Sequence, residues 1–241
     1  MPFIPDLTDP RYLDEVGWFL YHEKYGRRQF GGAYDEERLA YSHLLLDEVL
    51  SYCDRDEQWL RDKTVVSIGC GCTGDLAAWP AAVKIAVDPL LYTYQKLRML
   101  VEDVAGTSHT VHLPVGVEAL PLLDDCADLV VCRNALDHMP DPKMALRQIC
   151  RILKEDAPLF LSVDIGGFPT PDEPTVFSPE SLSALLEDQF AIVRHTDEHF
   201  SHSGWRAGSV RMVARKRLQD NCDLDRDQIL QAYIARLEQR E

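Results

Sequence analysis

The chain has 241 residues, 46% of them hydrophobic, and carries a formal net charge of −15 at pH 7. This length fits one domain with additions or two small ones, and the acidic balance argues against a nucleic-acid partner, because phosphate binding needs clustered Lys and Arg. There is no run of 18 apolar residues and no basic segment followed by an apolar one at the start, so we expect neither a membrane span nor a secretory signal.

The first 62 residues are predicted to be helical. Between Glu36 and Cys53, apolar residues recur at the spacing of one helix face. Upstream of that stripe the segment is rich in aromatic residues (Trp18, Phe19, Tyr21, Tyr25, Phe30 and Tyr34). We interpret residues 1–62 as a cap or lid over a ligand pocket. The alternative, in which the aromatic side chains only pack against the edge of the fold, stays open.

From Lys63 onward, strands alternate with helices. Five apolar runs, TVVSIG, VKIAVD, TVHLPV, ADLVVC and PLFLSVD, are typical of strands buried on both faces. Helical patterns lie between them, such as residues 92–104, and Asp141 with Pro142 marks the start of the helix after the fourth strand. The alternation predicts an α/β fold with a Rossmann-like, mostly parallel sheet and helices on both faces.

The last part of the chain departs from this alternation. A loop rich in Pro and Gly follows Asp164, and a helix capped by Ser178 comes next. Two strands, about 190–197 and 208–215, then follow each other without a helix, so they are expected to be antiparallel. We therefore predict a seven-stranded sheet with an antiparallel last strand in a domain of residues 63–217, and an extra C-terminal helix within residues 218–241.

The stretch VVSIGCGCTGDL ends the first of these strands with the spacing G-x-G-x-x-G, at Gly69, Gly71 and Gly74. Glycines here allow a tight turn and let the backbone approach a ligand, and free N–H groups beyond the turn favour an anion. Glycine clusters also end strands in proteins that bind nothing. The motif by itself is therefore weak evidence for a nucleotide-containing cofactor.

Asp88 strengthens that interpretation. It closes the second strand, 19 positions after Gly69, where an acid can accept hydrogen bonds from both ribose hydroxyls of a nucleoside. A nicotinamide dinucleotide and an adenosyl cofactor fit this pair of features equally well. Pro80 shortens any helix after the glycines, and together with the antiparallel final strands this favours the adenosyl cofactor.

Five motifs together indicate a protein family. In chain order they are the glycine turn, VDP, EALP, DLVVCRNALDH and RQICRILK. Over about Lys63 to Arg217 the chain resembles the class I S-adenosylmethionine-dependent methyltransferases, and more narrowly the bacterial small-molecule methyltransferases of type 11. The resemblance implies S-adenosyl-L-methionine as cofactor and a small-molecule acceptor.

The resemblance also implies a set of cofactor contacts. The glycine turn would run under the methionine part, and an acid would bind the ribose. Residues that follow the second and third strands would flank the adenine, and the end of the fourth strand would lie near the carboxylate and sulfonium. In that order these residues are Gly69, Cys70, Gly71 and Gly74; Asp88; Pro89, Leu90, Val117 and Glu118; and Arg133 and Asn134. The chain departs from the family pattern at Ser67, Cys72-Thr73 and Gly116, each of which puts one contact in doubt.

His138, just past the fourth strand, is the candidate general base for a hydroxyl acceptor, since histidine titrates near neutral pH. The alternative is that it only hydrogen-bonds the backbone of its turn. Asp137 beside it is interpreted as a residue at the start of the next helix. We expect no metal site, because DEHFSHSGW lacks ligand spacing and a metal at Cys70-x-Cys72 would conflict with the cofactor.

The sequence thus favours an S-adenosylmethionine-dependent methyltransferase that O-methylates a small molecule, such as a sugar or glycan precursor or a secondary metabolite. A nicotinamide-dependent oxidoreductase and a non-catalytic cofactor-binding relative remain alternatives. The acceptor is expected to be polar, anionic or a sugar, from the aromatic, histidine and arginine content of residues 1–60, 165–178 and 197–207. Seven cysteines, an odd count, suit a reducing cytoplasm, and a homodimer stays open.

Overall fold

The computed structural model describes residues 6, 8–25, 34–199 and 208–217. Its helices are α1 (Pro10–Tyr25), α2 (Tyr34–Cys53), α3 (Glu57–Leu60), α4 (Leu91–Lys96), α5 (Pro142–Ile152) and α6 (Pro179–Glu187). Its strands are β1 (Thr64–Ile68), β2 (Val83–Val87), β3 (Thr110–Leu113), β4 (Leu129–Arg133), β5 (Pro158–Ile165), β6 (Phe190–His199) and β7 (Gly208–Lys216). Two short 3-10 turns, η1 (Val117–Ala119) and η2 (Leu136–His138), follow β3 and β4.

The strands form one seven-stranded sheet in the order β3-β2-β1-β4-β5-β7-β6. Strands β1 to β5 pair in parallel, whereas β7 runs antiparallel to both β5 and β6. The predicted Rossmann-like sheet with an antiparallel last strand is therefore confirmed. Because the parallel strands all end at one edge, the turns that follow β1, β2, β3 and β4 meet there.

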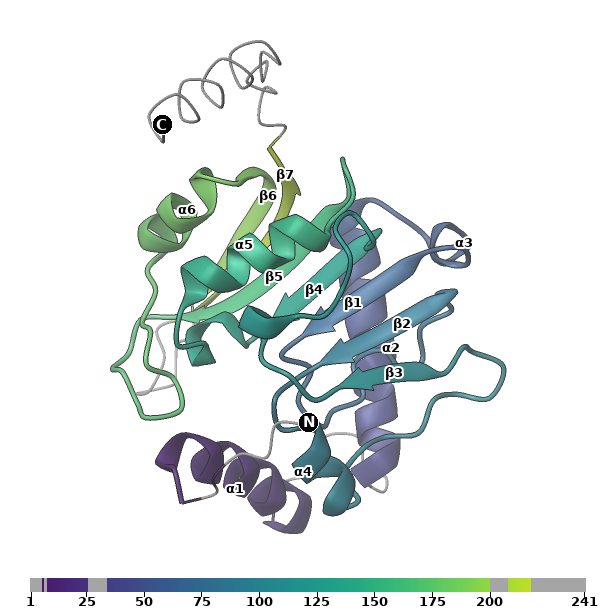
Figure 1. Ribbon diagram of the computed structural model, residues 1–241, viewed down its shortest axis with the longest axis vertical. Helices are drawn as coiled ribbons and strands as arrows, with labels where there is room; N and C mark the ends of the chain where they lie inside the picture. The colour runs from purple at the N-terminus through teal and green to yellow at the C-terminus, as the bar shows by residue number, and fades with distance from the viewer. Residues whose placement is uncertain (1–5, 7, 26–33, 200–207, 218–241) are drawn as a thin grey trace, which may run out of the picture.

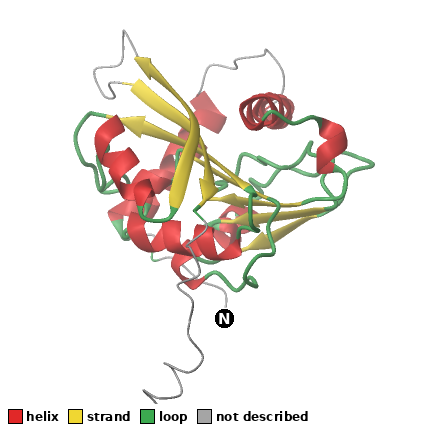
Figure 2. Cartoon of the chain, turned by 90° about the horizontal axis from the view of Figure 1, so that it is seen from above, coloured by secondary structure: helices red, strands yellow, loops and turns green. Residues whose placement is uncertain are grey.

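Helices cover both faces of the twisted sheet, α2 on one and α5 with α6 on the other (Figures 1 and 2). Side chains alternate along each strand, so that Val66 and Val130 pack on the α5 side while Val65 and Val131 pack on the α2 side. All four are fully buried. This two-sided burial explains why the central strands are apolar throughout.

Capping fixes where two of these helices begin. The side chain of Asp141 accepts a hydrogen bond from Met144 N–H, with Pro142 in the first turn of α5. Ser178 and Ser181 form a reciprocal capping box at the start of α6. Both starts are as expected from the sequence, because Ser or Asp before Pro satisfies backbone donors that the helix leaves open.

A helix was expected over residues 92–104, and its predicted length is wrong, because α4 ends at Lys96. The next residues form a Schellman cap: Arg98 takes a left-handed φ of 58°, Arg98 N–H donates to Gln95 O and Met99 N–H donates to Tyr94 O. Buried Arg38 of α2 donates to the Met99 carbonyl. Tertiary contact thus stops a helix that the local apolar pattern would continue.

In the described ranges, no helix combines the length and apolar character needed to cross a bilayer. The six cysteines described there are all free thiols. The predicted C-terminal helix lies outside the described residues, as do His202 and three arginines of the expected acceptor region (Arg27, Arg28 and Arg206).

Candidate active site

A cavity of about 510 Å³ opens at the edge of the sheet where the parallel strands end. Its walls come from the turns after β1, β2, β3 and β4, from α1, and from the loop after β5. Figure 1 shows α1 lying beyond this edge, next to α4. The volume is within the range of small-molecule sites, about 300–1,000 Å³.

At the glycine turn, two walls of the cavity lie close together. Gly69 has φ 67°, and a Cβ built on it would lie 2.2 Å from the Ala135 Cβ. Ala135 precedes η2, so the glycine brings the turn after β1 against the turn that carries His138. Ser42 of α2 supports the same segment from below, donating to Asp75 O and accepting from Ala78 N–H.

Asp88 stands at the end of β2 and borders the cavity. One carboxylate oxygen accepts from Gly71 N–H at 2.9 Å and the other from Leu90 N–H at 2.8 Å. Burial raises the pKa of Asp88, while these backbone hydrogen bonds and His138 counteract the rise. Each oxygen keeps acceptor capacity for a further donor, so the carboxylate is held ready for a pair of hydroxyls.

The remaining predicted contacts divide into two groups. Those that border the cavity with Gly69 and Asp88 are Pro89, Leu90, Val117, Glu118, Asn134 and His138. Gly116, where a relative often has an acid, also borders it, and the Glu118 carboxylate lies against its α-carbon, 2.6 Å from where a Cβ would sit.

The second group lies outside the cavity wall. Cys70, Gly71 and Gly74 border a separate space of about 20 Å³ behind the turn. Arg133 stacks over the Tyr41 ring of α2, with its guanidinium 4.8 Å from the ring centroid, and donates to the Tyr41 hydroxyl. Burial lowers the Arg133 pKa. Arg133 is therefore directed toward α2, whereas Asn134, with φ 47°, turns into the cavity.

Asp75 is a buried acid that the sequence motifs did not single out. Its carboxylate accepts from Ser67 Oγ at 3.0 Å and from Thr73 Oγ1 at 2.7 Å. Burial raises the pKa of Asp75 to about 6, against the effect of these two hydrogen bonds. Asp75 thus places a carboxylate beside Ser67, the position at which the family pattern has an acid, and Thr73 helps to hold it there.

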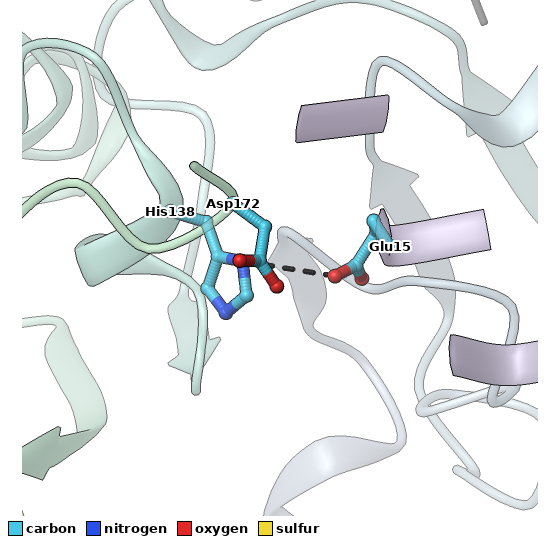
Figure 3. Close-up of side chains that lie close together, drawn as sticks. All are labelled: Glu15, His138 and Asp172. Carbon is cyan, nitrogen blue, oxygen red and sulfur yellow. Dashed lines mark ion pairs between the residues drawn. The ribbon is translucent and has the colours of Figure 1, made fainter. Parts of the chain in front are cut away.

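His138 lies between carboxylates that come from distant segments. Its Nδ1 is 3.7 Å from Glu15 Oε2 of α1, and its Nε2 is 3.6 Å from Glu173 Oε1 of the loop after β5. Asp172 joins this group, and its carboxylate lies beside the imidazole in Figure 3. Nε2 has no hydrogen-bond partner in the described part of the chain. The imidazole is therefore placed to exchange a proton, with a carboxyl group near each of its nitrogens.

Two further points concern this turn. Asp137 is fully buried within η2, and the helix cap is Asp141, so Asp137 does not start α5.

Glu15, Asp172 and Glu173 were missed by sequence reasoning, because no local pattern connects them with His138. Glu15, His138 and Asp172 bring their ligand-type atoms within 4.8 Å of one another, as do Asp137, His138 and Glu173. The expected absence of a metal site stays a prediction.

Glu15 gives the ligand-free protein a pH-dependent stability. Burial, with Asp88, Asp172 and Asp137 nearby, raises the Glu15 pKa from 4.5 to about 8. The folded chain therefore keeps a proton there that the unfolded chain loses above about pH 4.5, and stability falls as pH rises through this window. The full shift corresponds to about 5 kcal/mol, and we expect about 2 kcal/mol because water still reaches the side chain.

Urea unfolding near pH 5 and pH 8 checks this. Glu15→Gln should lose less free energy of unfolding than the wild type between these pH values, by about 2 kcal/mol. Asp14→Asn removes a charge from an exposed position next to it on α1 and should behave as the wild type. Equal losses in the wild type and Glu15→Gln would show that the Glu15 pKa is ordinary.

The cavity fits the adenosyl group that the sequence implies. A buried carboxylate, Asp88, faces it from the end of β2, while Ile68, Val115, Val117 and Leu90 give it apolar walls suited to a flat base. Polar groups fix orientation and apolar ones supply contact area in such sites.

Comparisons with known proteins agree with this geometry. Residues 66–161 match a family model described as a methyltransferase domain. A curated "Ubiquinone biosynthesis O-methyltransferase" of Haemophilus ducreyi is 29% identical over 126 residues, which are 50% of this chain and 53% of that protein. The chain spans about half or less of the length of the curated relatives it matches.

Solved structures extend the likeness to most of the chain. Magnesium protoporphyrin IX methyltransferase of Synechocystis PCC 6803, with bound SAM, gives a TM-score of 0.55 at 19% identity and covers 87% of this chain and 97% of its own. The structure of the [4+2]-cyclase SpnF gives a TM-score of 0.61 at 16% identity, and the match covers 90% of this chain and 98% of SpnF. At these identities the structural likeness establishes the fold.

Proposed function

We propose that the chain is a class I S-adenosylmethionine-dependent methyltransferase and that it transfers a methyl group to a hydroxyl of a small molecule bound beside His138. The cofactor is S-adenosyl-L-methionine, which supplies the methyl as an electrophile on its sulfonium. The observation that carries the proposal is the shared cavity: Asp88, at the end of β2, and His138, after β4, border the same space.

For the cofactor, we propose Asp88 as the ribose ligand, with Leu90 and Val117 against the adenine and Pro89 and Glu118 at its edges. Gly69 and Asn134 would lie along the methionine part. Gly71 acts through Asp88, since its N–H holds that carboxylate. Three predicted contacts would then support the site without touching the cofactor: Cys70 and Gly74 in the glycine turn, and Arg133 at the end of β4. The protein's contribution to methyl transfer is chiefly to hold the acceptor in line with the methyl.

For the acceptor, His138 would take the hydroxyl proton, with Glu15 and Glu173 stabilising the imidazolium that forms. O-methylation is supported by this base and, at low identity, by the curated O-methyltransferases. A sugar or glycan precursor and a secondary metabolite remain the proposed acceptor classes.

The segment organisation supports a lid. Phe19 of α1 packs against Gly71, and Glu15 of the same helix reaches His138. We propose that residues 1–62 form a cap whose helix α1 covers the site while α2 packs on the sheet, and that residues 63–217 form the cofactor-binding domain. Free thiols at the six described cysteines suit the cytoplasm as the place of action.

Removing the ribose ligand should weaken cofactor binding. Asp88→Ala is expected to reduce the affinity for S-adenosylhomocysteine by about 1.5–3 kcal/mol, the value of hydrogen bonds to a charged group. Calorimetry measures this directly. Asp47→Ala, an exposed position on α2, is the matched control and should bind as the wild type. An unchanged affinity in Asp88→Ala would remove Asp88 from the site.

The function itself is tested by incubating the protein with methyl-labelled S-adenosylmethionine and a metabolite extract, and identifying the labelled product by mass. A labelled methyl ether supports the proposal. If neither S-adenosylmethionine nor its demethylated product binds at about millimolar concentration, or reduced nicotinamide cofactor binds at about micromolar concentration, the proposal is wrong.

A further inference from the structure

The cavity is strongly acidic beyond what the cofactor requires. Five carboxylates border it, Glu15, Asp88, Glu118, Asp141 and Asp172, against one guanidinium, Arg11. The cofactor brings a single net positive charge at neutral pH, from a sulfonium and an ammonium less one carboxylate. Negative charge therefore remains when the cofactor is bound.

Three of these charged groups already have partners within the fold. Asp88 accepts two backbone hydrogen bonds, and Asp141 caps α5. Arg11 is paired with Asp9, the two side chains being 2.5 Å apart. Glu118, the middle residue of η1, is exposed. Glu15 and Asp172 are thus the carboxyl groups beside His138 that a cation could still pair with; Glu15, which keeps its proton in the ligand-free protein, would ionise when a cation binds there.

These two carboxylates and His138 form one corner of the cavity, which we call the acidic corner (Glu15, His138 and Asp172; Figure 3). Their ligating atoms all lie within 4.8 Å of one another. Thr170 Oγ1 donates to Asp172 Oδ1 at 2.6 Å and fixes that side chain. Among the described residues, no Lys or Arg forms an ion pair with Glu15 or Asp172. Burial makes the ionised form of Glu15 costly, and a cation bound beside it would offset that cost.

The spacing suits an ammonium group. A nitrogen that donates at about 2.8 Å to two acceptors separates them by about 4.6 Å in tetrahedral geometry. Ligands about 2.1 Å from a divalent ion lie only about 3.0–3.4 Å apart when adjacent. The ligand atoms of Glu15, His138 and Asp172 all lie within 4.8 Å of one another, and Glu15 Oε2 is 3.7 Å from His138 Nδ1. These spacings leave room for an ammonium group, and binding of a divalent ion is the competing outcome that the test separates.

We infer that the acidic corner binds the positively charged amine of the acceptor, which makes the substrate a hydroxyl compound with an ammonium group on a neighbouring carbon, such as an amino sugar or an amino alcohol. This inference rests on the proposed function. Glu15 and Asp172 hold the ammonium, and His138 faces the adjacent hydroxyl. An anionic acceptor, which the sequence left open, does not fit a wall with this charge.

The test begins with calorimetry of S-adenosylhomocysteine, because failure at that step refutes the proposed function and not only this inference. The protein saturated with S-adenosylhomocysteine is then titrated with glucosamine, ethanolamine and 2-amino-1,3-propanediol, each paired with its neutral counterpart glucose, ethylene glycol or glycerol. At least one amine should bind about tenfold or more tightly than its neutral partner, as expected for charge-assisted hydrogen bonds.

Variants assign the effect to the corner. Glu15→Gln should weaken amine binding about tenfold or more, and S-adenosylhomocysteine binding should stay within a few-fold. Asp14→Asn, with the same loss of charge on α1, should leave amine binding unchanged. The inference is wrong if no amine binds more tightly than its neutral partner, if Glu15→Gln has no effect, or if Mg²⁺ or Mn²⁺ alone binds in a Glu15-dependent manner.

Discussion

His138→Ala is expected to lower the rate of methyl transfer by about 10²–10⁴, the usual contribution of a general base. The imidazole borders the cavity and has Glu15 and Glu173 beside its two nitrogens, so it can take a proton and be stabilised as a cation. Affinity for S-adenosylhomocysteine should stay within a few-fold, because the proposed ribose and adenine ligands lie on other turns and Asn134, on the same turn, keeps its own side chain.

The pH profile separates a base from a structural histidine. Without His138, the residual rate should rise with pH as the acceptor hydroxyl ionises on its own, whereas a variant that is only misfolded loses activity at every pH. His195→Ala, an exposed position on β6, is the matched control and should keep the wild-type rate. A loss of less than about tenfold would mean that His138 is structural and that the acceptor needs no base.

Gly69→Ala is expected to destabilise the fold by about 2–5 kcal/mol, from the left-handed backbone and from overpacking. The added Cβ would lie 2.2 Å from the Ala135 Cβ, at a backbone φ of 67°. Either β1 or the turn after β4 must move, and both carry groups of the site. Urea unfolding measures the loss, and cofactor calorimetry on the folded fraction should show weaker binding.

A second glycine separates the two causes. Gly106 also has a positive φ, of 90°, but nothing lies within 4 Å of where its Cβ would be. Gly106→Ala should therefore show the backbone strain alone, about 1–2 kcal/mol. If the two variants lose the same free energy of unfolding, close packing against Ala135 contributes nothing at Gly69.

The cofactor side of the site could be predicted from the sequence because its signals are local. An apolar strand, a glycine turn and an acid at the end of the next strand fix Gly69 and Asp88 at the same sheet edge in any parallel fold. The turn after β4 follows the same logic, which brought Asn134 and His138 into the cavity. Arg133 was expected there too, but the side chains of successive strand residues point to opposite faces, and Arg133 faces α2.

The acceptor side could not be predicted in this way. Glu15 comes from α1 and Asp172 from the loop after β5, and only the tertiary arrangement brings them to His138. The same holds for Asp75, which reaches back to Ser67 across the turn. Over residues 92–104 the sequence predicted a structure that is not there. The apolar pattern continues, but the helix ends because Arg98 adopts the left-handed conformation.

The position of β7 has a consequence for synthesis of the chain. β7 is the last strand made, yet it lies between β5 and β6, and among the described strands β6 pairs only with β7. Until residues 208–216 leave the ribosome, the nascent protein carries an open edge along β5 and an unattached β6. Unpaired edges recruit strands from other chains. A premature stop before Gly208 should therefore yield an aggregation-prone product and not a smaller, working enzyme.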